Sequence, residues 1–112
     1  MVRGYSENQV REMGFPRADY SFPKEPGEGS GTLVMKMWGN KCLICYFDMD
    51  DGSKIKLSLF REHERDRHFY PENSDIDFTE VEIGSQMEIS YGITRTGKAK
   101  FLTADFLEED AD

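Results

Sequence analysis

Hydrophobic and polar residues alternate with a period of two along several segments between Gly31 and Leu107. Alternation of this kind is typical of β-strands that bury one face. We predict strands at residues 32–38, 42–49, 54–60, 86–93 and 98–106. Their apolar positions form one face of the expected sheet: Leu33, Met35, Met37, Leu43, Cys45, Phe47, Ile55, Leu57 and Leu59. The opposite face is a mixture of cationic and aromatic side chains.

The segments between the strands carry turn residues. Asp50-Asp51-Gly52-Ser53 predicts a tight hairpin, because Asp-Gly tolerates the positive φ of such turns. Residues 61–77 are polar and fit either a short helix or a long loop. Near the N-terminus, Ser6-Glu-Asn-Gln9 fits a capping box, which predicts a helix near 7–13. The prolines and glycines of residues 14–31 then favour an extended connector.

The chain therefore divides into an N-terminal arm (1–30), a β-barrel domain (31–107) and an acidic tail (108–112). A length of 112 residues suits one core-forming domain of this size. No apolar run approaches the ~20 residues of a membrane span, and no signal peptide is evident. We expect a cytoplasmic protein with no membrane partner.

The predicted order is three meandering strands, a polar crossover and a final hairpin. This order, together with Val81-Glu-Ile-Gly-Ser-Gln-Met-Glu-Ile-Ser-Tyr91, resembles an OB fold, because a glycine turn there leads into alternating apolar residues. The resemblance covers residues 31–107 and implies a mainly β, five-stranded Greek-key barrel, preceded by a short N-terminal helix or arm. An SH3-like barrel, or an open sheet with the arm helix packed on it, fits the same pattern.

The cationic and aromatic face is the leading candidate binding surface. Bases stack on aromatic rings while ammonium groups follow the phosphates, so such a face suits single-stranded nucleic acid. Its expected members come from the first three strands, the last strand and the turn before it: Lys36, Trp38, Tyr46, Lys54, Lys56, Phe60, Arg95, Lys98 and Lys100. Two structural explanations compete with this one. Exposed lysines commonly protect a sheet edge, and a bulge would turn Trp38 inward.

The overall charge opposes this interpretation. The formal net charge is −8, and four acids crowd the tail at residues 108–112. An acidic surface could instead mimic phosphates and bind a basic protein partner. The residues expected on that alternative surface are Asp48, Asp50, Asp51, Glu72, Asp75, Asp77, Glu80 and Glu82. A structural role without either activity is the third possibility.

Catalytic, metal and cofactor sites are not expected. Cys42 and Cys45 fall three apart in a strand, so they point to opposite faces and predict free thiols. The aspartates before Gly52 lack the closing glutamate of a calcium loop. His63 and His68 are five apart and show no third ligand in the sequence. Since no nucleophile or phosphate-loop motif is present either, we expect a non-enzymatic binding module.

Overall fold

The computed structural model describes residues 14–39, 42–60 and 68–107. A short 3-10 turn, η1 (Arg17–Asp19), precedes β1 (Gly27–Gly39), β2 (Cys42–Met49), β3 (Lys54–Phe60), β4 (Gln86–Ile93) and β5 (Ala99–Phe106). The strands form one antiparallel sheet in the order β3-β2-β1-β4-β5, and no α-helix occurs within the described ranges. The mainly β prediction is therefore confirmed. The predicted helix near 7–13 lies outside the described residues.

The observed strand bounds agree with most of the predicted ones. The second, third and fourth strands have the predicted limits, and the fifth begins one residue later, at Ala99. The first strand is longer than predicted, because it starts at Gly27 inside the expected connector. A Cβ at Gly31 would lie 2.8 Å from the Asp48 backbone oxygen, so glycine permits the close approach of β1 and β2 at this position. The described part of the crossover, from residue 68 onward, contains no helix.

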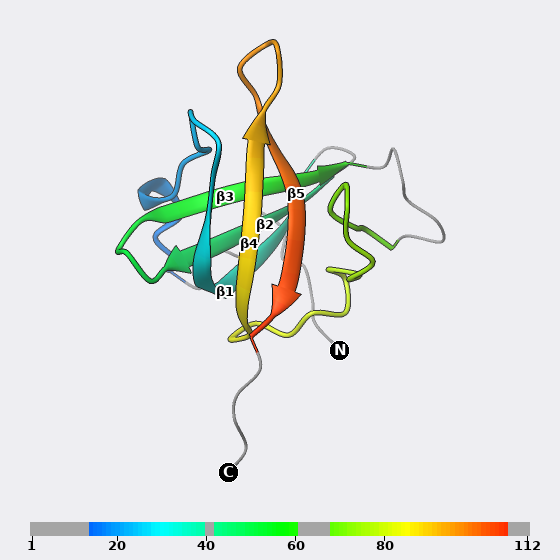
Figure 1. Cartoon of the computed structure of the whole chain (residues 1–112). Coiled ribbons are helices and arrows are strands. Elements are labelled where there is room, and N and C mark those ends of the chain that lie inside the picture. Colours follow the sequence, from blue (N-terminus) through cyan, green and yellow to red (C-terminus); the bar gives the residue numbers. More distant parts are fainter. Residues whose placement is uncertain (1–13, 40–41, 61–67, 108–112) are drawn as a thin grey trace.

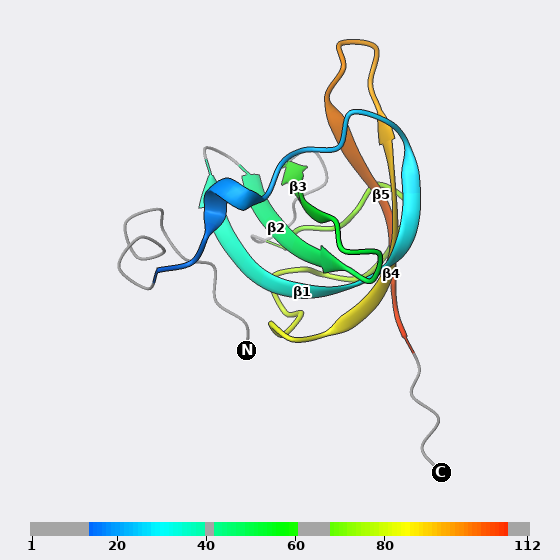
Figure 2. The same ribbon diagram turned by 90° about the vertical axis from the view of Figure 1, so that its left-hand side faces the viewer.

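Strand β1 joins the two halves of the sheet. Its first part, Gly27–Thr32, pairs with β4, and its second part, Gly31–Gly39, pairs with β2. Figure 2 shows how β1 curves from one half to the other. Strands β3 and β5 are the two edges, and some of their Cα atoms approach within 8 Å although they share no ladder.

A β-bulge in β1 changes which side chains share a face. Leu33 pairs with Phe47, but the next pair is Met35 with Tyr46, so Val34 is the extra residue. Beyond it, Lys36 lies opposite Cys45, whereas Met35 and Met37 have moved to the other face. The predicted apolar face is therefore wrong for Met35 and Met37, because one added residue exchanges the two faces of a strand.

Each face of the sheet carries its own buried cluster. The inner cluster draws on all five strands and on the loop before β4; its buried members are Leu33, Leu43, Cys45, Phe47, Ile55, Leu57, Leu59, Phe69, Phe78, Val81, Met87, Ile89, Ala99, Phe101 and Ala104. The outer cluster is smaller, with Tyr20, Met35, Met37 and Tyr46 buried and Phe15, Val34 and Ile44 partly buried. The segment that carries Phe15 and Tyr20 therefore covers the outer face of β1 and β2.

Candidate nucleic-acid interface

Lys36, one of the expected surface cations, is fully buried. Its side chain is 0% exposed, and its ammonium group donates a hydrogen bond to the Phe78 carbonyl oxygen. Burial lowers the pKa of Lys36 to about 8, although Cys45, Asp77 and Glu80 act in the opposite direction. The expectation that Lys36 faces outward is wrong, because the bulge at Val34 turns it toward the inner cluster.

Tyr46, one of the expected stacking aromatics, is also buried. Its ring centroid lies 5.3 Å from that of Phe15 and 5.4 Å from that of Tyr20, both in edge-to-face geometry. Its hydroxyl donates to the Met37 sulfur at 3.6 Å. Tyr46 does point to the outer face, as its alternation predicts, but residues of the N-terminal segment cover it. A nucleobase therefore has no access to this ring.

Lys54 helps to hold that covering segment. The Tyr20 hydroxyl donates a hydrogen bond to Asp48, and the Lys54 ammonium lies 3.4 Å from the same carboxylate. The ammonium also lies 5.2 Å from the centre of the Tyr20 ring. Burial and the neighbouring Asp48 carboxylate raise the pKa of Tyr20, so the phenol stays protonated and continues to donate. Lys54 and Asp48 thus act together in an intramolecular contact.

Trp38 remains accessible, in a different setting from the expected one. Its side chain is 44% exposed, and its ring packs edge-on against Phe69 with centroids 5.6 Å apart. Because Trp38 pairs with Leu43, it lies on the side of the inner cluster, at the rim. The Phe60 side chain is not among the described ones, so its expected exposure stays a prediction.

Two of the remaining cations, Lys56 and Lys98, lie at a groove where β3 approaches β5. The groove has a volume of about 390 Å³ and is lined by Phe22, Ser58, Gly97, Lys98 and Ala99. Phe22 is 40% exposed, and the Lys56 ammonium lies 4.8 Å from the centre of its ring. Phe22 was not predicted as a site residue. The feature of the sequence that could have indicated it is an aromatic residue close to Tyr20 inside an otherwise Pro-rich and polar connector.

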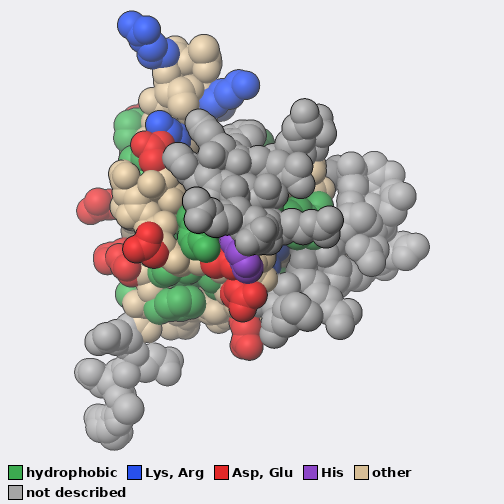
Figure 3. All heavy atoms as spheres, turned by 90° about the vertical axis from the view of Figure 1, so that its right-hand side faces the viewer, with side chains coloured by type: hydrophobic (Ala, Val, Ile, Leu, Met, Phe, Trp, Pro, Cys, Tyr) green, Lys and Arg blue, Asp and Glu red, His purple; other side chains and the backbone are tan. Residues whose placement is uncertain are grey.

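The charges around this groove are unevenly compensated. Lys100 forms an ion pair with Glu72, at 2.5 Å. Lys56, Arg95 and Lys98 have no carboxylate within 4.0 Å among residues 14–39, 42–60 and 68–107. Figure 3 shows Lys and Arg side chains gathered at the end of the molecule that carries the β4–β5 turn, with most Asp and Glu side chains nearer the other end. The sequence-predicted cations therefore come together only in part.

The acidic residues of the alternative surface also divide into two groups. Asp48 and Asp77 are partly buried and serve internal contacts: Asp48 binds Tyr20 and Lys54, and Asp77 accepts hydrogen bonds from the backbone of Phe69 and Thr79. The others are exposed on the β2–β3 turn or the loop before β4: Asp50, Asp51, Glu72, Asp75, Glu80 and Glu82. The Ser53 backbone N–H donates to Asp51, and this bond lowers the pKa of Asp51.

The two cysteines are free and buried. Burial raises the pKa of the Cys45 thiol to about 12 and also raises that of Cys42. Since the thiolate is the nucleophilic form, neither side chain is prepared for nucleophilic chemistry near neutral pH.

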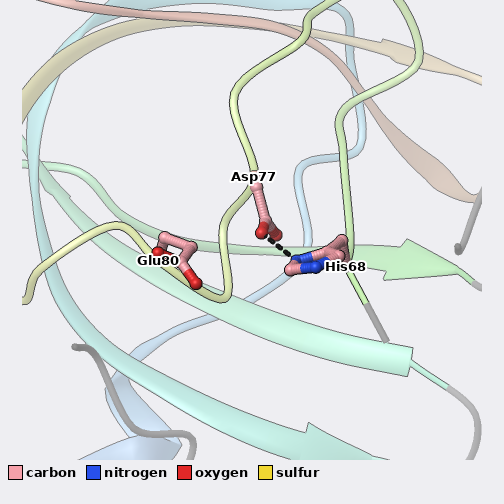
Figure 4. A group of neighbouring side chains, drawn as sticks. All are labelled: His68, Asp77 and Glu80. Carbon is pink, nitrogen blue, oxygen red and sulfur yellow. Dashed lines mark hydrogen bonds and ion pairs between the residues drawn. The ribbon is translucent and has the colours of Figure 1, made fainter. Parts of the chain in front are cut away.

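One cluster was not expected from the sequence. His68, Asp77 and Glu80, from the loop between β3 and β4, bring a ring nitrogen and two carboxylates together (Figure 4). Asp77 and Glu80 lie nine and twelve residues after His68 in the sequence, so local spacing gives no sign of this cluster.

Comparison of the chain with protein-family models, with curated proteins and with solved structures found no match. Within the described residues, no helix combines the length and apolar character that crossing a membrane requires.

Proposed function

We propose that the protein is an OB-like binding module that holds a short single strand of nucleic acid in the groove beside Phe22. The strand order β3-β2-β1-β4-β5 and the approach of β3 to β5 support the OB-like assignment, because an OB barrel closes between these strands. The module is non-enzymatic and binds by stacking and charge.

The observation that carries the proposal is the half-exposed Phe22 ring beside Lys56 and Lys98, which have no carboxylate within 4.0 Å among the described residues. Stacking of a base on an aromatic ring contributes about 1–3 kcal/mol and tolerates any sequence. Lys56 lies over one part of the ring, and Lys98 lines the same groove. Arg95, exposed in the adjoining turn, adds a third cation to this end of the chain's β4–β5 hairpin.

The net charge of −8 limits the strength of this binding. Polyanion affinity arises from cations that displace counterions, so only a few phosphates can be neutralised here. The proposal therefore predicts a short site with modest affinity and a shallow salt dependence.

Fluorescence anisotropy of a labelled oligothymidine, measured at several salt concentrations, tests the proposal. Phe22→Ala should weaken binding by an amount equivalent to about 1–3 kcal/mol, or roughly 5- to 150-fold. Phe106→Ala is the matched control, because Phe106 is 52% exposed and lies outside the groove. Equal affinities for the two variants would contradict the proposed stacking on Phe22.

A second pair of variants tests the cations. Lys98 and Lys100 are close in the chain, but Lys100 pairs with Glu72. Lys98→Gln should reduce the slope of log affinity against log salt by about 0.7, the value of one phosphate contact on a single strand. Lys100→Gln should change it less. Absence of salt-dependent binding at low ionic strength would refute the proposal altogether.

The exposed carboxylates favour a second candidate, in which the loop before β4 binds a basic protein. Asp75, Glu80 and Glu82 are exposed there and resemble a row of phosphates in charge. A labelled oligoarginine peptide serves as the probe. Charge reversal of these three residues should release it, and retention by that variant would exclude phosphate mimicry. Asp77 is left unchanged because it holds the loop together.

A further inference from the structure

The loop between β3 and β4 brings three metal-binding side chains to one point. Ligand atoms of His68, Asp77 and Glu80 all lie within 4.8 Å of one another. Figure 4 shows the Asp77 carboxylate and the His68 imidazole directed at each other, with the Glu80 side chain beside them. None of these residues lines the groove beside Phe22, so the cluster is separate from the proposed nucleic-acid site.

Two buried phenylalanines explain why the residues meet. Phe69 and Phe78 both belong to the inner cluster, and the Phe78 N–H donates to the Phe69 carbonyl at 2.8 Å. His68 and Asp77 immediately precede these anchors, so they emerge side by side at the surface. A turn then brings Glu80 back, since its N–H donates to the Asp77 carbonyl at 3.0 Å. The backbone therefore sets the spacing before any ligand arrives.

Asp77 is held in place as a carboxylate. One of its oxygens accepts hydrogen bonds from the Phe69 N–H, at 3.1 Å, and from the Thr79 N–H, at 3.0 Å; the Thr79 hydroxyl also donates to it. The second oxygen is directed at Nδ1 of His68. Outer-shell bonds of this kind orient metal ligands in known sites.

We propose that His68, Asp77 and Glu80 form a binding site for a divalent transition-metal ion of the Zn²⁺ type. The ion would lie between His68 Nδ1 and the Asp77 carboxylate, with Glu80 as the third ligand. Tetrahedral Zn²⁺ with bonds of about 2.0–2.2 Å separates its ligand atoms by roughly 3.4 Å. The Glu80 side chain is exposed and free to rotate, so its carboxylate can approach the other two ligands from within 4.8 Å to this spacing. A water molecule would complete the tetrahedron.

The local charge favours such an ion, and its chemistry indicates which kind. Among the described residues, the carboxylates of Asp77 and Glu80 interact electrostatically with Lys36, whose ammonium donates to the Phe78 carbonyl oxygen. An imidazole ligand suits Zn²⁺, Co²⁺ or Ni²⁺, whereas Mg²⁺ and Ca²⁺ take oxygen ligands. His68 is 41% exposed at its side chain, which gives the ion a path from solvent.

The single tryptophan of the chain offers a local signal, because Trp38 packs on Phe69, the neighbour of His68. Chelator-treated full-length protein is titrated with Zn²⁺ by calorimetry and with Co²⁺ by Trp38 quenching and visible absorption. We expect one saturable site for each ion, and no competition from Mg²⁺ at equal concentration. Absence of saturable binding would overturn the proposal.

Variants then assign the ligands. His68→Gln and Glu80→Gln should each weaken Zn²⁺ binding by at least ~10-fold, since loss of an outer-shell partner alone costs about that much. The matched controls are His63→Gln, at the chain's other histidine, and Glu82→Gln, at an exposed neighbouring carboxylate. Thr79→Val should weaken binding about 10–100-fold through the orientation of Asp77. Equal losses in the ligand and control variants would refute the assignment.

Discussion

The inner and outer clusters bury apolar side chains on opposite faces of the same sheet, but they are closed in different ways. The inner cluster is built from residues of all five strands, with Phe69, Phe78 and Val81 added from the loop before β4. The outer cluster is closed by Phe15 and Tyr20, which belong to no strand. Polar contacts to Asp48 and Lys54 assist this closure. Lysines and aromatics that alternate along a strand can therefore mark an intramolecular interface as readily as a ligand surface.

The strongest test of this difference compares one aromatic residue from each cluster. Phe78 is fully buried and contacts the rings of Phe47 and Phe101, so Phe78→Ala should lower the free energy of unfolding by about 3–5 kcal/mol. Tyr20→Ala should cost less, about 1.5–3 kcal/mol, because it removes one side chain from a small cluster. Urea denaturation measures both values. An equal or larger loss for Tyr20→Ala would contradict the ranking of the clusters.

The buried ammonium of Lys36 is the polar exception inside the inner region. Its pKa is about 8 in the folded protein and 10.5 in a model peptide, so the unfolded chain binds the proton more tightly. The cost of burying the charged form is fully present below pH 8. It disappears as the pH rises toward 10.5, so Lys36 should make the protein more stable in alkaline solution.

Comparison with Lys36→Met isolates this effect from other titrating groups. Between pH 7 and pH 10.5, the stability of the natural protein should improve relative to the variant by on the order of 2–3 kcal/mol. Chemical denaturation in the presence of a chelator measures the difference at each pH. If the difference in unfolding free energy between the two proteins is constant across this pH range, burial does not lower the pKa of Lys36.

Removal of a single hydroxyl tests the polar closure of the outer cluster. Tyr20→Phe deletes the hydrogen bond to Asp48 but keeps the ring contacts with Phe15 and Tyr46. The free energy of unfolding should fall by about 0.5–1.5 kcal/mol, because Asp48 is partly exposed and can bind water instead. Tyr70→Phe is the control, since the described residues offer its hydroxyl no hydrogen-bond partner. Equal losses of stability in Tyr20→Phe and Tyr70→Phe would contradict a stabilising hydrogen bond between Tyr20 and Asp48.

The smallest expected effect concerns Lys54, at the edge of the outer cluster. Lys54→Gln removes the contact with Asp48 and the cation–π contact with Tyr20. Because the Lys54 and Asp48 side chains are both half-exposed, the free energy of unfolding should fall by only about 0.2–1 kcal/mol. This decrease should become smaller at high salt. Thermal unfolding at two ionic strengths measures it. A loss that is independent of salt would argue against an electrostatic contribution.

Most strand bounds were predictable because they depend on local information, whereas the start of β1 at Gly27 depends on pairing with the distant β4. Alternation defines the strands, and the Asp-Gly turn defines the hairpin between β2 and β3. The bulge at Val34 was not predictable, because Val-Met-Lys-Met contains no residue that signals one. A bulge is a property of two paired strands, so it becomes visible only with the partner in place.

The candidate sites depended still more on distant contacts. Tyr46 is covered by Phe15 and Tyr20. The prolines and glycines around these two residues predict only an extended connector, so their packing on the sheet was not expected. The cluster of His68, Asp77 and Glu80 requires the backbone bond between Phe69 and Phe78. Sequence spacing alone therefore could not relate His68 to Asp77, although both flank large apolar residues that a core would use.

The double pairing of β1 has a consequence for how the chain reaches this structure. The β1–β2–β3 meander and the β4–β5 hairpin each join neighbours in the sequence, so their loops close at low entropic cost. Pairing of Gly27–Thr32 with β4 instead joins segments that lie far apart in the sequence. Long-range pairing of this kind is slow. We therefore expect the amide hydrogens of the β1–β4 ladder to be the last to gain protection against hydrogen exchange during refolding. Formation of this ladder would then be the slow step that joins the two halves of the sheet.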